Sequence, residues 1–296
     1  MFGFLPHNLY TNHVGQNTTG LSPRLWSQVS GSLMASDGDK RLALSGDDFL
    51  CVHFSGDTDA RVITDLISEQ PYYFFSDDLS NHSFSNAIDE KGGVLQLAQD
   101  AGGANEEISI EAGNAVGSLG TISTTSGDSH MMAFECRVKW NHITDGALTN
   151  GNIISAIGLL GPGSSGGNVL QDSASLTLAN HGIGFTIPVD DGDTVDFFYE
   201  AASQTRVDAL EDIKALTNNE FTKLGFIYDP DEVATKRIKV YVDNEEQGTY
   251  VTQTQIEAAT FPDAETLQFC AAMKSVAGGD ACEMSIDWWA FAQVLS

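Results

Sequence analysis

The sequence is poor in positive charge. Lys and Arg account for only 14 of its 296 residues, against 41 Asp and Glu, and the formal net charge is −27. Such a surface repels phosphate backbones and anionic lipid headgroups, so we expect no nucleic acid and no membrane among the partners. The charge suits a well-solvated surface, or attraction to cations or to a basic partner.

Cysteines and long apolar runs are also scarce. The four cysteines contain no CxxC pair, which argues against a disulfide framework or a zinc site and predicts buried, reduced thiols at Cys51, Cys136, Cys270 and Cys282. No apolar window approaches the roughly 20 residues of a membrane span. The first residues lack a basic stretch and are interrupted by Pro6 and His7, so they do not resemble a signal peptide. We therefore expect synthesis and folding in a cytosol.

The pattern of the chain changes near residue 71. Residues 1–70 mix turn-forming residues with isolated apolar ones and show no sustained period, which predicts an irregular N-terminal arm or small docking segment. Within it, "RLALSGDDFLCVHF" (41–54) predicts a hairpin that turns at "SGDD". The stretch 59–71 fits either a short helix or a strand.

From residue 71 to residue 296 the chain alternates apolar and polar residues between turn clusters. In "MMAFECRVKW" the residues Met132 and Phe134 alternate with Glu135 and Arg137, and "NIISAIGLLG" (152–161) is apolar on both faces, as a central strand would be. Many such strands predict an all-β fold, a jelly-roll sandwich of two antiparallel sheets. The stretch 205–219 has apolar residues every third position, so a helix and a strand both remain open there.

The chain ends in "CEMSIDWWAFAQVLS". Strict alternation places Cys282, Met284 and Ile286 on one face, with Trp288 continuing that face and Trp289 on the opposite one. We expect a core strand that closes the domain, because a strand bonded on both sides does not fray.

Several phrases of the sequence resemble known β-sandwich families. The hairpin "RIKVYVDNEEQGTYV" (237–251), with its turn in "DNEEQG", resembles one in laminin-G-like and concanavalin-like jelly rolls. The ordered phrases "YYFFSDDL", "MMAFECRVKW", "LTNNEFTKLGFIYDP" and "MSIDWWAFAQ" resemble a family of tailed-phage and prophage virion structural proteins with a concanavalin-like jelly roll. The resemblance covers roughly residues 71–296.

The resemblance implies a bacteriophage virion structural protein, acting as capsid decoration, cement or a fibre-like component. It implies subunit association without catalysis, with the major capsid protein or other virion subunits as partners. The resemblance also implies a homo-oligomer, with a trimer expected, and a protein that resides in the virion after synthesis in the host cytoplasm. The alternative is a carbohydrate-binding, lectin-like module for host attachment.

A glycoside hydrolase is the third reading. "EISIE" (107–111) resembles the E-x-D-x-E strand of jelly-roll glucanases, in which two carboxylates act as nucleophile and acid/base, but Ser109 replaces the middle Asp. Glu107 and Glu111 stand about 13 Å apart by the strand rise, and no aromatic sugar platform flanks them. We therefore interpret this strand as an exposed polar face, and we predict no catalytic residues.

A calcium site is possible where Asp190, Asp191 and Asp193 surround Gly192. The stretch lacks the spacing of an EF-hand and its distal glutamate, so a solvated turn is the favoured interpretation. The glycine-rich "GPGSSGG" (161–167) has no lysine and is read as a loop. We accordingly predict no metal and no cofactor.

Overall fold

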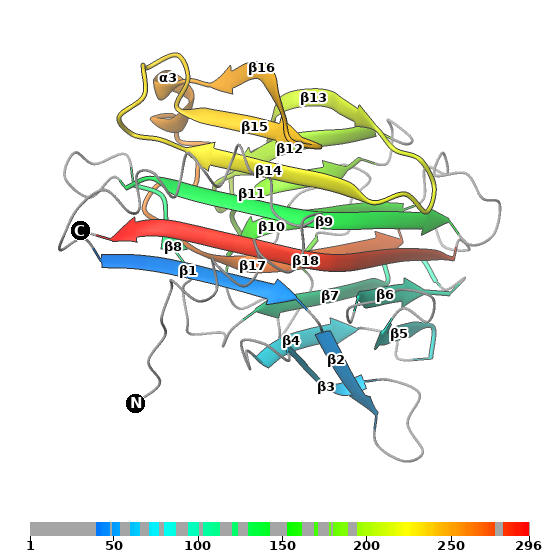
Figure 1. The fold of residues 1–296 in the computed structure, drawn as a ribbon. Helices are drawn as coiled ribbons and strands as arrows, with labels where there is room; N and C mark the ends of the chain where they lie inside the picture. Colours follow the sequence, from blue (N-terminus) through cyan, green and yellow to red (C-terminus); the bar gives the residue numbers. More distant parts are fainter. Residues whose placement is uncertain are drawn as a thin grey trace.

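The computed structural model describes most of the chain from residue 40 onward. The described residues are 40–47, 49–53, 60–65, 71–76, 80–86, 94–100, 103–112, 120–123, 130–142, 153–161, 169–170, 178, 180–188, 194–275 and 281–295. They form antiparallel strands and one short helix, α3 (Gln253–Ile256), which begins with a capping box at Thr252 (Figure 1).

One sheet has eight strands in the described chain. Its order is β16 (Glu245–Val251), β15 (Ile238–Val242), β14 (Thr222–Tyr228), β9 (Met132–His142), β18 (Cys282–Leu295), β6 (Leu95–Gln99) and β5 (His82–Asn86), and β1 (Lys40–Asp47) also pairs with β18. The terminal strand β18 is therefore central, as its apolar pattern predicted. Figure 1 shows β18 in red between β9 and β1.

The other sheet has ten strands in the described chain. Its order is β13 (Val207–Ala215), β12 (Thr194–Glu200), β11 (Gly182–Ile187), β10 (Ile153–Leu160), β17 (Thr266–Ser275), β7 (Glu107–Ala112), β4 (Pro71–Ser76), β3 (Ala60–Asp65) and β2 (Phe49–His53), with β8 (Gly120–Thr121) on β17. The doubly apolar strand β10 lies between β11 and β17, which confirms its predicted central place.

The two sheets pack face to face around one large apolar core. Aromatic rings from the two sheets contact each other in the core. The ring centroids of Phe226, in the eight-stranded sheet, and Phe197, in the ten-stranded sheet, are 5.5 Å apart. Trp289 stacks on Phe269 at 4.5 Å, and its indole nitrogen donates to the hydroxyl of Tyr72. The predicted two-sheet antiparallel sandwich is confirmed.

In the part of the chain that the structure describes, three strands precede residue 71. β1 pairs with the second half of β18 from Lys40–Leu295 to Asp47–Trp288, whereas β2 pairs with β3 in the other sheet. The predicted hairpin over 41–54 is therefore wrong: its two halves belong to different sheets. The stretch 59–71 contains strand β3, not a helix. Residues 1–39 lie outside the described residues, and the role of residues 1–70 as an arm or docking segment stays a prediction.

A bulge in β18 changes which tryptophan enters the core. Ile286 pairs with Val138 and Trp288 with Arg137, so Asp287 is an extra residue between two consecutive residues of β9. The insertion reverses the alternation, so Trp289 joins the inter-sheet core and Trp288 does not. The sequence-based assignment of Trp288 to the core face was wrong for this reason.

Irregular pairing also explains the three-residue spacing in β13. Two register shifts occur where β13 pairs with β12, between Val195 and Phe197 and between Phe197 and Phe198. Each extra residue on β13 shifts the side-chain phase, so Leu210 is buried and Ile213 packs against the same core. The strand alternative for 205–219 is correct.

Candidate functional site

The carboxylates of β7 lie on the outer face of the ten-stranded sheet, the face turned away from the inter-sheet core. Glu107 is 0% exposed, Ser109 3% and Glu111 2%. The predicted exposed polar face is therefore wrong, although the alternation that separates these residues from Ile108 and Ile110 is correct. A part of the chain distant in sequence covers this face.

Glu107 is bonded by that covering chain. Its Oε1 accepts the N–H of Val169 at 2.7 Å, and its Oε2 accepts the N–H of Leu170 at 2.8 Å. The ammonium of Lys274, opposite Glu107 on β17, donates to the carbonyl of Leu170 at 2.8 Å and lies 3.9 Å from Glu107 Oε2. Burial raises the pKa of Glu107 to about 7, against these donors, which favour the ionised carboxylate.

A second carboxylate, that of Glu200, also binds the segment that covers this face. Leu178 pairs with Leu170 in a β-bridge, and its N–H donates to Glu200 Oε2 at 3.0 Å. Burial raises the pKa of Glu200 to about 7. Under these covering residues (Val169, Leu170 and Leu178) lies a second apolar cluster on the sheet's outer face, formed by Ile154, Ala156, Leu160, Phe198, Cys270 and Ala272.

The closed face does not suit glycoside hydrolysis. Glu111 lies four positions after Glu107 on the strand, a span of about 13 Å, whereas carboxylate pairs in glycosidases stand about 5–5.5 Å or 6.5–9.5 Å apart. Both oxygens of Glu107 already accept backbone N–H groups. Among the described residues Glu111 accepts a hydrogen bond only from the side-chain amide of Gln268, at 2.6 Å, and it is buried. The structure thus brings neither carboxylate to a surface where a glycan could reach it.

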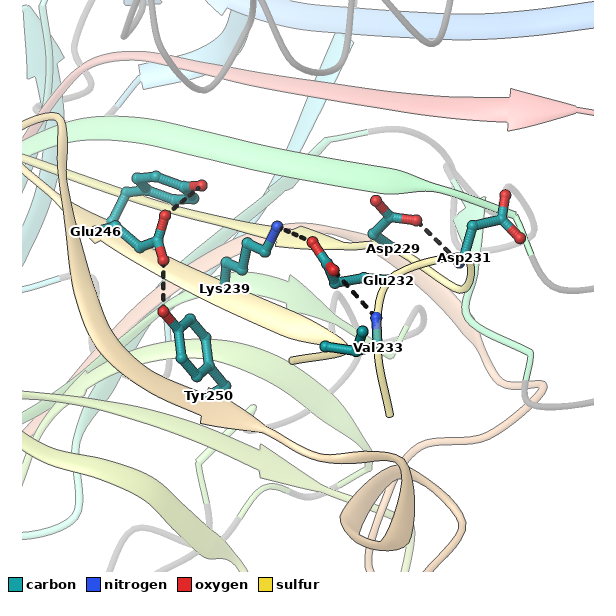
Figure 2. Close-up of polar contacts among 8 residues, drawn as sticks. Asp229, Asp231, Glu232, Val233, Lys239, Glu246 and Tyr250 are labelled. Atoms are coloured by element: carbon teal, nitrogen blue, oxygen red, sulfur yellow. Dashed lines mark hydrogen bonds and ion pairs between the residues drawn. The ribbon is translucent and has the colours of Figure 1, made fainter. Parts of the chain in front are cut away.

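The outer face of the eight-stranded sheet presents a different arrangement, which we call the tyrosine–carboxylate patch (Lys239, Tyr241, Glu246 and Tyr250). Strands β15 and β16 pair Lys239 with Tyr250 and Tyr241 with Glu246. The Tyr250 hydroxyl donates to Glu246 Oε1 at 2.7 Å, and the Tyr241 hydroxyl lies 3.5 Å from Glu246 Oε2. Tyr241 is buried, while the other three are half-buried. Figure 2 shows the Tyr250–Glu246 bond.

The loop between β14 and β15 borders this patch. Lys239 donates to Glu232 of that loop (Figure 2). The ammonium of Lys236 lies 4.6 Å from the centroid of the Tyr250 ring. Val233 is 57% exposed, the one large apolar side chain so exposed among the described residues. Ion pairing with Lys239 lowers the pKa of Glu232, so its carboxylate stays ionised.

Sequence reasoning found only half of this patch. The alternation in "RIKVYV" already separates Lys239 and Tyr241 from the core residues Ile238 and Val240. The positions of Glu246 and Tyr250 depend on a register shift in β16 around Gly248, whose φ is +74°. The return strand also begins at Glu245, earlier than the six-residue turn predicted, because Asp243 and Asn244 alone reverse the chain.

The remaining predicted sites have mixed outcomes. Asp190, Asp191 and Asp193 lie outside the described residues, as do residues 162–167. Among the described residues no group of three or more His, Cys, Asp or Glu could hold a metal ion. The thiols that the structure describes are free and buried, as predicted, at Cys136, Cys270 and Cys282. No helix in the described part of the chain is long and apolar enough to cross a membrane.

No protein-family model and no curated protein matches this sequence. Solved structures do resemble the chain. Peanut lectin with a nine-residue peptide aligns at 14% identity and a TM-score of 0.48, over 87% of this chain and 99% of that one. An endo-1,3-β-glucanase from Streptomyces sioyaensis aligns at 11% identity and a TM-score of 0.47, over 84% of this chain and 98% of the glucanase. The carbohydrate recognition domain of Emp47p aligns at 10% identity and a TM-score of 0.45, over 87% of this chain and 98% of that domain.

Likeness at these identities concerns the fold alone. The chain is an all-β jelly-roll sandwich of two antiparallel sheets, and what it binds has to be argued from its own residues.

Proposed function

We propose that this protein is a non-catalytic carbohydrate-binding module whose saccharide site is the tyrosine–carboxylate patch. The observation that carries the proposal is the Glu246 carboxylate, which faces the hydroxyls of Tyr241 and Tyr250 and lies half-buried beside the Tyr250 ring. Binding sites for small polar ligands combine apolar or aromatic surface with a few precisely placed polar groups. A saccharide offers both counterparts, since its hydroxyls donate to carboxylates and its C–H faces lie on aromatic rings.

The patch is held in place before any ligand arrives. The phenol hydroxyls orient the Glu246 carboxylate, and Glu232 holds the ammonium of Lys239. Groups that are already ordered lose less conformational entropy on binding, so more of their interaction energy remains as affinity. Val233 adds exposed apolar surface at the edge of the patch.

The carboxylates of the ten-stranded sheet support a binding role over a hydrolytic one. Glu107 holds the covering residues with both oxygens, and Glu111 lies buried in the same face. Hydrolysis would require this face to open and a substrate to bridge about 13 Å.

The test is a glycan array followed by titration calorimetry on the best saccharide, each with and without calcium. Replacing Glu246 by Gln removes the charged acceptor, and we expect affinity to fall about tenfold or more. Tyr250→Ala, which removes the ring, should lower affinity further. Asp100→Asn is the matched control, because Asp100 is an exposed carboxylate beyond β6 at the other edge of the sheet.

Unchanged binding by both patch variants would place the saccharide elsewhere, and no binding by the parent protein would refute the proposal. Hydrolysis of β-glucans that disappears in the Glu107→Gln, Glu111→Gln double variant would favour the enzyme instead.

The virion role implied by the family resemblance stays a prediction. The virion role and the carbohydrate-binding role are compatible, because a virion protein could bind saccharides of the host. Mass spectrometry of gradient-purified particles tests it, and particles without this chain would count against it.

A further inference from the structure

Two side chains on the outer face of the ten-stranded sheet leave buried oxygens unused. Gln268 of β17 donates its amide to Glu111 Oε2 at 2.6 Å, and the two residues are 0% and 2% exposed. The other carboxylate oxygen of Glu111, Oε1, and the amide oxygen of Gln268, Oε1, are also buried and have no hydrogen-bond partner among the described residues. Both atoms are acceptors, so whatever satisfies them must supply positive charge or donated hydrogens.

The described residues offer Glu111 no counter-charge. The lysine of this face, Lys274, pairs with Glu107 in register and bonds to the covering chain, about 13 Å along the sheet from Glu111. Opposite Glu111 stands Cys270, whose thiol pKa is raised by burial and then by the charges of Glu111 and Glu107, so it stays neutral. Buried charges in proteins are paired or coordinate metal ions.

We propose that Glu111 Oε1 and Gln268 Oε1 bind one alkali-metal cation, Na⁺ or K⁺, in the outer face of the ten-stranded sheet. One monovalent ion neutralises the single uncompensated carboxylate, whereas a divalent ion would leave a buried positive charge. Oxygen atoms of carboxylate and amide groups are the ligands that hard cations prefer. The ion would join β7 to β17 beside the covering residues, so the stability of the fold would depend on which cation is present, beyond the effect of ionic strength.

The test is thermal unfolding of the full chain in NaCl, KCl or choline chloride at one ionic strength. Choline is too large for a buried site and screens charge equally. We expect a saturable rise in Tm with Na⁺ or K⁺, about 5 °C or more once the ion exceeds its dissociation constant a hundredfold.

Glu111→Gln supplies the discriminating variant. Its amide can donate to Gln268 Oε1 and carries no charge, so it satisfies the orphaned acceptor without an ion. This variant should unfold at a higher temperature than the parent in choline chloride and gain nothing from Na⁺ or K⁺. Asp100→Asn removes one exposed charge and should respond as the parent does.

Equal Tm of the parent in alkali and choline salts would overturn the proposal, and so would an alkali response that persists in Glu111→Gln. If that variant fails to fold, sodium NMR of the parent decides. Line broadening that a second alkali ion displaces at millimolar concentration supports the site, and its absence rejects the site.

Discussion

Deleting a single residue from the central strand β18 gives a sharp test of the bulge. Asp287 is the extra residue that stands between the pairs Ile286–Val138 and Trp288–Arg137. Removing it restores regular alternation without changing which side chains face the core, because Trp289 still follows two positions after Ile286. The loss is then the ion pair between Asp287 and Arg137, whose side chains are 14% and 30% exposed. A partly exposed pair is worth about 0.2–1 kcal/mol.

Deleting Ala290 instead, three residues further along, has the opposite effect. It moves Phe291, which is 0% exposed, to the outer face and brings Ala292 into its place in the core. The change is equivalent to a buried Phe→Ala replacement and costs about 3–5 kcal/mol. Total stabilities of single domains are about 5–15 kcal/mol, so this deletion should leave the protein marginal or unfolded.

Urea unfolding followed by tryptophan fluorescence measures both variants, and the Asp287 deletion should lower the free energy of unfolding by only about 0.2–1 kcal/mol. The bulge assignment would be refuted if that deletion proved as damaging as the deletion of Ala290.

Further stability predictions concern the buried carboxylate of Glu107 and two glycines, Gly184 and Gly248. The pKa of Glu107 is raised from 4.5 to about 7, so its contribution to stability is present below about pH 4.5 and is lost as the pH rises to about 7. The free energy of unfolding should fall by up to about 3 kcal/mol more between about pH 5 and pH 8 in the parent than in Glu107→Gln, and equal slopes would contradict this. Gly184→Ala should cost about 3 kcal/mol, since its Cβ would stand 2.5 Å from the carbonyl oxygen of Ile157. Gly248→Ala meets nothing within 4 Å and should cost only about 1–2 kcal/mol for its φ of +74°; urea midpoints check the order.

The strands could be predicted from the sequence because burial between two layers imposes a period of two. That rule succeeded for β9 and β10, whose inward residues enter the core. It failed wherever one strand gains a residue on its partner, since a bulge changes the phase without changing the composition. Trp288 and Trp289 exchanged faces for this reason, and the irregular pairing of β13 imitated a helical spacing.

Which strands pair with each other was harder to predict from the sequence than where the strands lie. β1 and β2 are separated by one residue, yet they pair in different sheets. The reason lies in β18, which has 14 residues, whereas β6 pairs with only the first part of it, from Cys282 to Ile286. The second part needs another partner, and β1 supplies it. The residues 41–54 alone do not indicate that the second part of β18, far away in the sequence, is available as a pairing partner.

The polar face of β7 shows a more general limit. Alternation identifies which residues turn away from the core, but an outward residue is exposed only if no other part of the chain lies over it. Here Val169 and Leu170 cover Glu107 from 62 and 63 residues away in sequence. Burial, and not the expected solvation, keeps this carboxylate from a ligand. Glu111 is also buried, and its second oxygen has no partner among the described residues; water would satisfy such an oxygen on an open face, which is why we propose a cation on this closed one.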